Sequence, residues 1–412
     1  MHDHHGRSVE GAREVRIGRL PGNTVLSQSG RLRRIAAGER TYSQSQPQHY
    51  RHGRPGFHLD LSELRLVQLE GQPPVLMTEL EKIHAKAQGH KFFDITDTPD
   101  LGYSASLRTA SRPVFPSPNS SDLIKPILKN LSVENLKSTL GEFTSFRTRY
   151  YRSDTGKQSE KWLLGKIAEI TRESAPPSLQ DIISIKEFSH SWPQSSIIVR
   201  INGSSPDDGV IIIGAHQDRV RIHGHSCQLQ GADDDGSGSM SILESYRALL
   251  EADFRPQRAV EFHWYSAEEG GLLGSQAVAR DYEARSVNVV AMSQYDMTAW
   301  VKRGTREEVG IITDFVNTEL TEFNKKLVDA YLDIPYVDTK CGYACSDHAS
   351  WGKAGYPSVF TIESTFENSN HYIHSANDRM DISDEFSFTH MREFSKLAVA
   401  FAIELGGWKK SD

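Results

Sequence analysis

The sequence predicts an α/β fold in which a mostly parallel sheet is covered on both faces by helices. Two observations predict it. Apolar runs of strand length alternate with amphipathic helical stretches along most of the chain, which is the pattern of a parallel sheet with helical crossovers. The longest of these runs, GVIII from Gly209 and NVVAM from Asn288, suit buried strands and are too short to span a membrane.

The elements are expected in the following order. An apolar segment begins at Leu61, and residues 76–87 have helical spacing with Thr78 as the cap. A Pro- and Ser-rich linker covers 111–122, and a domain boundary is expected near 108–122. Helices are predicted at 122–140, 155–174, 237–252, 272–284, 314–332 and 384–406. Strands are predicted at 195–202, 210–215, 258–266, 287–296, 309–313 and 357–362.

Composition narrows the class of protein. The 412 residues carry a formal net charge of -7, and 25% of them are charged, so the chain shows no basic excess of the kind that binds a phosphate backbone. Three cysteines are too few for a disulfide scaffold. The length allows two or three domains, or one catalytic domain with an appendage, and we expect a soluble enzyme.

The first sixty residues differ from the rest. They hold ten arginines, no lysine and six histidines, and they lack a sustained hydrophobic period, so residues 1–60 are predicted to be a disordered tail. The histidines at 2, 4 and 5 would bind metal only adventitiously. Met1 is followed by His-Asp-His-His without an apolar run, so no signal peptide is recognisable at this start.

Polar side chains follow the predicted buried strands. His216 and Asp218 come directly after one strand, Glu268 and Glu269 follow the next, and Asp296 closes a third. The acidic turn GADDDGSG at 231–238 lies between the first two, and HYIHSANDR later supplies His371 and His374. Open α/β sheets place their sites at the carboxyl ends of strands.

Each of these pieces has an ordinary alternative. An acidic triplet before glycine usually caps a helix, and paired glutamates usually begin a solvated one. Together, however, imidazole and carboxylate groups at one sheet edge predict a metal site, and that mixture suits zinc. Five ligands exceed the needs of one tetrahedral zinc, whereas two zincs sharing a carboxylate account for all of them. Asp218 can then orient His216, and one glutamate remains as a base.

Six strings resemble the co-catalytic two-zinc aminopeptidases, and within them the fungal leucine aminopeptidases. They are GAHQD (214–218), GADDDGSG (231–238), YSAEEGGLLGS (265–275), QYDM (294–297), CGYACSDHASW (341–351) and IHSANDR (373–379). The resemblance covers about 60–412. It implies a three-layer α/β/α sandwich with a mixed, mostly parallel central sheet, which agrees with the pattern of strands and helices.

The resemblance also implies a role for each matched residue. Asp234 would bridge two zinc ions, His216 and Asp296 would complete one site, and Glu269 and His374 the other. Glu268 would be the general base, Asp218 the partner of His216, and Tyr343 a donor to the oxyanion. An apolar pocket for Leu-like side chains would come from Met297, Phe360, Ile362 and Phe366, although core packing explains Ile362 and Met297 equally well.

Further expectations concern maturation. In the resembled family Cys341 and Cys345 form a disulfide, and an i,i+4 pair on a helical turn falls inside the disulfide window, with two reduced thiols as the alternative. Residues 66–102 resemble a pro-region that is removed, which implies a zymogen. The resemblance implies secretion, so the first sixty residues are hypothesised to reflect an incorrect gene model or an altered exon. The sequons begin at Asn119, Asn130 and Asn202.

The chain departs from the family in one loop. Arg219 stands where the family commonly has Ser, and residues 220–230 do not resemble the usual loop. His223 and His225 lie in it and are interpreted as loop residues, and Cys227 has no evident mate.

The predicted organisation is a tail (1–60), a pro-region-like segment (61–108) and a catalytic domain (109–412). The predicted function is removal of N-terminal residues from peptides by a secreted glycoprotein with two zinc ions, acting as a monomer without nucleic acid or membrane. Three alternatives stay open: a two-zinc carboxypeptidase or aminoacylase, a single-zinc glutaminyl-cyclase-like acyl transferase, and a binding module without metal.

Overall fold

The computed structural model describes residues 59–408, except for 70, 89, 91, 110–113, 206–207 and 221–229. These described residues belong to one compact unit. The predicted tail falls almost wholly outside the described residues, as do the histidines at 223 and 225 and the cysteine at 227. No helix among the residues that the structure describes is both long and apolar enough to cross a bilayer.

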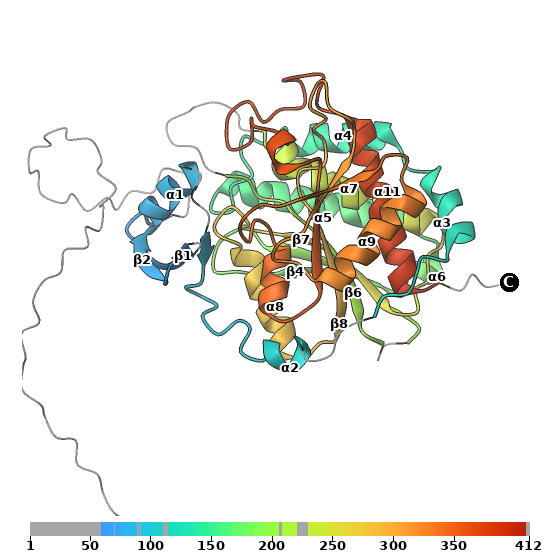
Figure 1. Cartoon of the computed structure of the whole chain (residues 1–412), viewed down its shortest axis with the longest axis horizontal. Coiled ribbons are helices and arrows are strands. Elements are labelled where there is room, and N and C mark those ends of the chain that lie inside the picture. The colour runs from blue at the N-terminus through green and yellow to red at the C-terminus, as the bar shows by residue number, and fades with distance from the viewer. Residues whose placement is uncertain are drawn as a thin grey trace, which may run out of the picture. The chain divides into compact units, whose positions relative to one another are not determined.

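An eight-stranded mixed sheet organises the chain, in the order β10-β9-β11-β8-β6-β7-β5-β4. Its strands β4, β6, β7 and β8 are labelled in Figure 1. The neighbours β11, β8, β6 and β7 are parallel to one another, and so are β10 and β9, whereas β9–β11, β7–β5 and β5–β4 pair antiparallel. The strands are β4 Ile183–Phe188, β5 Ser196–Ile201, β6 Val210–His216, β7 Ala259–Tyr265, β8 Val289–Tyr295, β9 Val309–Ile312, β10 Tyr336–Thr339 and β11 Ser358–Ile362.

Two hydrophobic clusters cover the two faces of this sheet. Alternate residues of β6 enter different clusters: Ile211 and Ile213 join one, Val210 and Ile212 the other. The larger cluster contains residues of α3 Ser121–Leu128, α4 Val133–Phe143, α5 Asp154–Ser174, α7 Gly238–Glu251, α9 Thr318–Tyr331 and α11 Phe388–Gly406. The smaller contains residues of α8 Leu273–Ala284 and α10 His348–Lys353. The predicted three-layer α/β/α sandwich with a mixed sheet is confirmed.

Several boundaries differ from those predicted. The helix expected at 122–140 is two helices, α3 and α4, because Ser132 caps a new helix by accepting a hydrogen bond from the backbone of Asn135. Residues 76–78, the start of the segment 76–87 predicted to be helical, lie in strand β2 Val75–Thr78, while Thr78 caps α1 Glu79–Ala87 as expected, with Glu81 completing a capping box. The edge strands β4 and β10 were not predicted. The short helices are α2 Ala105–Thr109 and α6 Pro177–Gln180.

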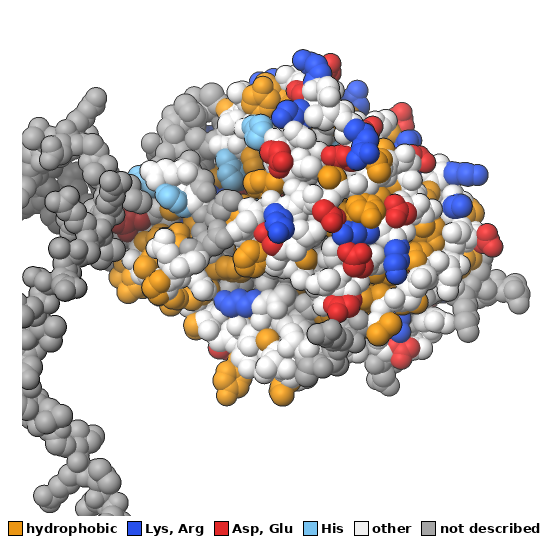
Figure 2. All heavy atoms as spheres, viewed as in Figure 1, with side chains coloured by type: hydrophobic (Ala, Val, Ile, Leu, Met, Phe, Trp, Pro, Cys, Tyr) orange, Lys and Arg blue, Asp and Glu red, His pale blue; other side chains and the backbone are white. Residues whose placement is uncertain are grey.

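A second, three-stranded sheet precedes the large one. Its order is β2-β1-β3, with β1 Leu64–Leu69, β2 Val75–Thr78 and β3 Phe92–Asp94, and we call residues 60–109 with their helix α1 the N-terminal segment. Large apolar side chains are exposed here, among them Leu76 and Tyr103. Figure 2 shows orange side chains over this part of the face, whereas acidic and basic side chains are interspersed over the rest.

Candidate metal centre and active site

The carboxyl ends of three adjacent parallel strands bring the acids and one histidine together. β6 lies between β7 and β8 and is parallel to both. His216 is the last residue of β6, and Asp296 follows β8 directly. Glu268 and Glu269 follow β7 in a turn where Ala267 has a φ of 62°. The sheet topology therefore places on one edge the residues that the sequence identified by their position after each strand.

Two of the three consecutive aspartates support the main chain. Both oxygens of Asp235 accept backbone N–H groups, from His216 at 3.0 Å and from Gly238 and Met297 at 2.8 and 3.2 Å. Asp233 likewise accepts the amide of Ala299 and the side chain of Asn370. Although Asp235 lies within ligand distance of His216 and Asp296, its oxygens are already occupied, so we regard it as structural.

Asp234, the middle acid, faces the two histidines instead. Its Oδ1 lies 3.1 Å from His216 Nε2 and its Oδ2 lies 3.0 Å from His374 Nε2. Asp296 Oδ1 lies 3.6 Å from the same nitrogen of His216, and Glu269 Oε2 lies 3.3 Å from His374 Nε2. One carboxylate thus stands between two clusters, each with a further acid and a histidine.

Buried polar atoms in these clusters lack hydrogen-bond partners of good geometry. They include both ring nitrogens of His216, Oε2 of Glu269 and Oδ1 of Asp296. Buried groups of this kind are normally satisfied, and one ring nitrogen of a neutral imidazole together with carboxylate oxygens can donate electron pairs to a cation. The mixture of imidazole and carboxylate donors fits zinc, so the residues present fit the predicted metal.

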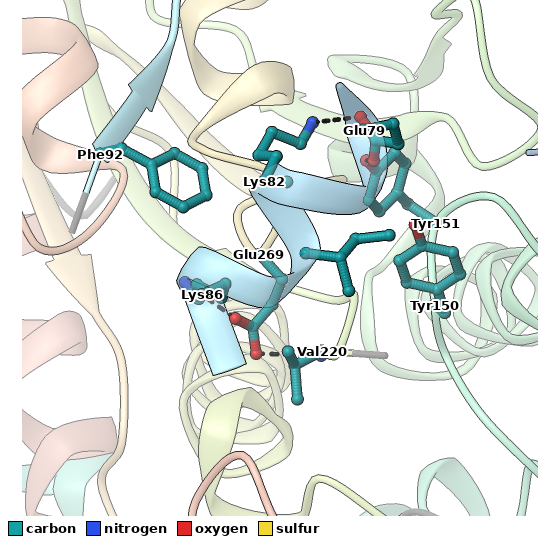
Figure 3. Close-up of a pocket in the computed structure, with 10 residues that line it drawn as sticks. Glu79, Lys82, Lys86, Phe92, Tyr150, Tyr151, Val220 and Glu269 are labelled. Carbon is teal, nitrogen blue, oxygen red and sulfur yellow. Dashed lines mark hydrogen bonds and ion pairs between the residues drawn. The ribbon is translucent and has the colours of Figure 1, made fainter. Parts of the chain in front are cut away.

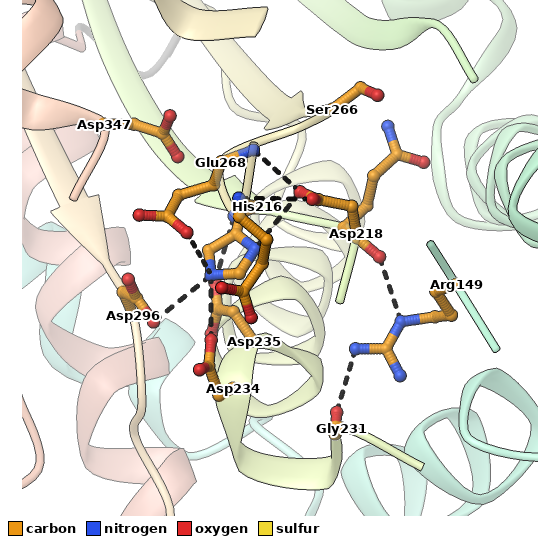
Figure 4. A network of polar contacts seen from close by, with 12 residues as sticks. Arg149, His216, Asp218, Gly231, Asp234, Asp235, Ser266, Glu268, Asp296 and Asp347 are labelled. Carbon is orange, nitrogen blue, oxygen red and sulfur yellow. Dashed lines mark hydrogen bonds and ion pairs between the residues drawn. The ribbon is translucent and has the colours of Figure 1, made fainter. Parts of the chain in front are cut away.

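Asp218 supports the site from behind His216 (Figure 4). Its Oδ1 lies 3.4 Å from His216 Nδ1 and accepts the backbone N–H of Glu268 at 2.9 Å, and its Oδ2 accepts that of Glu269 at 3.3 Å. Asp218 is fully buried. It therefore holds the glutamate turn through two backbone amides and places a carboxylate beside Nδ1 of the imidazole that the sequence paired with it.

Arg149 stabilises the same region, and no pattern in the sequence predicted it. The guanidinium donates to the main-chain carbonyls of Gln217, Gln230 and Gly231, and so joins the end of β6 to the acidic turn (Figure 4). It is fully buried. Three backbone acceptors in two segments make it a structural clamp behind the metal cluster.

Glu268 lies beside the clusters without belonging to either. Its Oε2 is 4.0 Å from His216 Nε2, and burial raises its pKa well above the ordinary range, against the opposing charges of Lys86 and His216. It lines a cavity of about 190 Å³ together with Leu272, Tyr343 and His374. A carboxyl group beside a metal cluster, facing a cavity and with a raised pKa, is suited to proton transfer.

The N-terminal segment reaches into this cavity. Lys86, near the end of α1, places its Nζ 2.9 Å from Glu269 Oε2 (Figure 3). The same Nζ lies 3.5 Å from Glu268 Oε2. Burial by itself would lower the pKa of Lys86, but the two carboxylates outweigh it and raise that pKa well above its ordinary value. His90 and Phe92 line the same cavity. The sequence contains no signal for this contact, because it depends on how the segment docks.

The predicted substrate-pocket residues form an apolar cluster. Met297, Phe360 and Ile362 are buried together with Cys341, and Phe366 and Tyr343 pack against them. The cavity itself is lined by Tyr343, Ala344 and Cys345 rather than by Met297, Phe360, Ile362 or Phe366. Burial raises the pKa of Tyr343. The structure thus places these four residues behind the cavity wall.

The two cysteines of the CGYAC string are joined by a disulfide with a Cα separation of 6.2 Å. They lie in an irregular loop between β10 and α10, so the expected helical turn is wrong although the distance agrees. His371 is exposed and its ring nitrogen contacts the carbonyl of Glu367, away from the clusters. The sequon residues Asn119, Asn130 and Asn202 are all exposed.

Two further acids escaped the sequence analysis. Asp378, fully buried, accepts the backbone N–H groups of Asp233 and Asp234 at 2.8 and 3.2 Å, and its pKa is raised to about 7 by burial and by the charge of Asp233. Asp347 accepts a hydrogen bond from Gln294. Asp378 lies in the string IHSANDR and Asp347 in the string CGYACSDHASW, and their place in these strings is the one sequence feature that could have identified them.

Known peptidases are similar to this chain in sequence and in structure. The sequence model of peptidase family M28 matches residues 196–399. Leucine aminopeptidase 1 of Colletotrichum graminicola is 48% identical over 354 residues, 84% of this chain and 86% of that protein. Leucine aminopeptidase 1 of Chaetomium globosum is 47% identical over 341 residues, 80% and 82% of the two chains. The LapA aminopeptidase of Legionella pneumophila superposes with a TM-score of 0.72 at 29% identity, over 84% of this chain and 95% of that one.

Proposed function

The chain belongs to peptidase family M28, and on that premise we propose that it is a zinc aminopeptidase which removes N-terminal, preferably Leu-like, residues from peptides. The position of Asp234 carries the proposal: one carboxylate spans two histidines, and each histidine has a second acid beside it. His216 and Asp296 would hold one zinc ion and Glu269 and His374 the other, with Asp234 shared. The names of the relatives supply the substrate class.

Bound zinc would polarise the scissile carbonyl and lower the pKa of a water molecule toward about 7. Glu268 would take the proton of the attacking water and return it to the leaving amine. Its place beside the clusters, facing the cavity, supports this role. Tyr343, which lines the same cavity, would donate a hydrogen bond to the developing oxyanion.

The acids of the site suit a substrate amine. An ammonium group already lies against Glu268 and Glu269, namely that of Lys86. The same two carboxylates would accept the free α-ammonium of a peptide by charge-assisted hydrogen bonds. A carboxypeptidase would instead need a cationic group for a substrate carboxylate at this place, so the contact favours an aminopeptidase over that rival.

Zinc content measured together with activity tests this proposal. Purified chain without the N-terminal segment should hold two zinc ions and hydrolyse an unblocked leucine anilide. The N-acetylated analogue should be turned over far more slowly, since it lacks the ammonium group. Equal rates on both substrates would support an aminoacylase, and a single zinc ion would support the cyclase-like alternative.

We further propose that the N-terminal segment keeps the enzyme inactive until it is removed. Lys86 would occupy the amine position, while His90 and Phe92 wall the cavity on the side of the segment. The segment is anchored elsewhere too, since the backbone N–H of Asp94 donates to the carbonyl of Gly271. Substrate would therefore compete with an internal amine held at high effective concentration.

The variant Lys86→Met in the uncleaved chain tests this zymogen proposal. Loss of the ammonium group should raise activity several-fold over the uncleaved wild type, while the cleaved forms of both should be equally active. Lys186→Met, at an exposed lysine on the edge strand β4, is the matched control and should change neither form. Uncleaved wild type as active as the cleaved enzyme would refute the role of the segment.

Secretion, glycosylation and a monomeric state are part of the same proposal. The Cys341–Cys345 disulfide supports an oxidising compartment. Exposure of Asn119, Asn130 and Asn202 makes all three sequons accessible to a glycosyltransferase. A mass shift on treatment with an endoglycosidase, for protein recovered from the culture medium of its host, would test the first two, and light scattering would test the third.

A further inference from the structure

Arg219 occupies an unusual position for an arginine. It follows directly on His216, Gln217 and Asp218 at the end of β6, and it is completely buried. Burial lowers the pKa of Arg219, and the charges of Asp378, Glu269 and Asp234 oppose that effect. A long cation at this depth, surrounded by the acids of the site, is placed to act on the site rather than on solvent.

The aliphatic part of the Arg219 side chain packs against the start of the acidic turn at Gly231. Gly231 has a φ of 56°, and a β-carbon added there would lie 2.5 Å from Arg219 Cδ and 2.8 Å from Cγ. Because Gly231 begins the turn that carries Asp234, the aliphatic stem of Arg219 lies against the backbone just before the shared ligand. Only glycine leaves room for this contact.

The guanidinium then reaches the turn that carries the second histidine. Nη2 of Arg219 donates to the carbonyl oxygen of Ser375 at 2.6 Å. Ser375 follows His374, whose φ of 55° lies in the left-handed region that non-glycine residues adopt only when their surroundings hold them there. The other two nitrogens of the guanidinium, Nε and Nη1, have no hydrogen-bond partner among the described residues. Within the part of the chain that the structure describes, the side-chain hydrogen bond of Arg219 therefore falls beside a ligand in a disfavoured conformation.

Arg149 shows by contrast what Arg219 adds. Arg149 ties the end of β6 to the Gly231 turn through three carbonyls. It makes no contact with the 371–379 turn among the hydrogen bonds of the described residues. Arg219 itself follows the end of β6, packs against Gly231 and donates to the turn that carries His374. It therefore links the three parts of the backbone that carry His216, Asp234 and His374.

We propose that Arg219 is a positioning residue that holds His374 in the geometry needed to retain the second zinc ion. The inference rests on the proposed two-zinc function. Residues behind a metal ligand usually change metal affinity about 10–100-fold when they are removed. The effect should fall on the zinc held by Glu269 and His374 and spare the one held by His216 and Asp296.

Zinc retention in Arg219→Met tests the inference directly. Methionine keeps an apolar stem against Gly231 but has no donor for the Ser375 carbonyl. Dialysis against graded concentrations of a chelator, followed by metal analysis, should show one equivalent retained as in wild type and the other about 10–100-fold more weakly. Arg247→Met is the matched control, because Arg247 also donates to a main-chain carbonyl, that of Asn130, far from the site, and it should retain both ions normally.

The outcomes separate the possibilities. Folded Arg219→Met with wild-type retention of both ions, or with equal weakening of both, would overturn the positioning role. Should that variant fail to fold, Arg219→Gln decides, since its shorter amide does not reach the Ser375 carbonyl: weaker retention of one equivalent supports the role, and unchanged retention of both overturns it. Wild-type protein with fewer than two ions would refute the two-zinc function first, and this inference with it.

Discussion

The two histidines that approach Asp234 are held in opposite ways. His216 is the last residue of a central strand and is completely buried, with a backbone N–H fixed by Asp235. The side chain of His374 is 30% exposed and belongs to a turn with a positive φ at the histidine itself. We call His216 with Asp296 the strand-borne half of the site, and Glu269 with His374 the turn-borne half.

The difference shows where the site is open to control. The strand-borne half takes its geometry from the sheet, which cannot move without breaking the core. The turn-borne half depends on groups from distant segments: Lys86 contacts Glu269, and Arg219 contacts the residue after His374. The proposed regulation by the N-terminal segment and the proposed positioning by Arg219 both act on this half.

Glu268 lies between the halves, and its replacement should have the largest effect on catalysis. Glu268→Gln removes the base while leaving all five ligands, so kcat should fall by about 10²–10⁴-fold with two zinc ions retained. Glu269→Gln should instead lose the zinc of the turn-borne half. Initial rates on a leucine anilide and metal analysis of both variants measure this. Near-wild-type turnover by Glu268→Gln would show that the base is another group.

Removing each histidine from the metal-free protein should separate the halves by stability. His216→Ala leaves the carboxylates of Asp218 and Asp296 buried without the cationic imidazole between them. This should lower the free energy of unfolding by about 3–5 kcal/mol. His374→Ala, at a partly exposed turn, should lower it by about 1 kcal/mol or less. Urea denaturation of both variants gives the comparison, and equal losses would contradict the distinction between the halves.

Asp218→Asn should have an intermediate effect on the strand-borne half. Asparagine keeps the shape but presents one acceptor oxygen where the carboxylate offers two, to His216 and to the amides of Glu268 and Glu269. Zinc affinity or kcat/KM should fall about 10–100-fold. The same chelator titration used for Arg219→Met measures it. Asp233→Asn is not a suitable control because Asp233 supports the acidic turn, whereas Asp338→Asn on the edge strand β10 should change neither quantity.

The strand-borne half could be predicted from the sequence far better than its surroundings. His216 and Asp296 end apolar runs, and a buried strand followed by a polar group is visible in one dimension. The alternation of apolar runs with helical stretches also predicted the three-layer sandwich and most of the strands of its sheet. The edge strands β4 and β10 were missed because their half-exposed residues make no continuous apolar run.

The contacts that adjust the site had no such signal. Lys86 lies near the end of an amphipathic helix, where a basic residue is ordinary, and Arg149 follows an unremarkable polar stretch. Which of Asp233, Asp234 and Asp235 faces the histidines is decided by the backbone of the turn, not by the composition of the triplet. The resemblance to a family selected the middle acid, and spacing by itself left the choice open.

The smallest expected effect is a loss of local stability in the N-terminal segment at acid pH. Buried Asp94 accepts hydrogen bonds from Arg65 and Lys82, and although burial opposes ionisation, those two cations hold its pKa below the usual range. A depressed carboxyl pKa contributes stability that is present above about pH 4 and is lost as the pH falls through the lower, folded-state value. Hydrogen exchange, corrected for intrinsic rates, should therefore rise in residues 64–94 as the pH falls from 5 to 3, while β6 stays protected.

Asp94→Asn should exchange faster already at pH 7 and show a flatter pH dependence, because it cannot ionise. If the variant kept the wild-type profile, Asp94 would not be the group that couples the segment to pH, and the turn-borne half would be covered equally at every pH at which the core is folded.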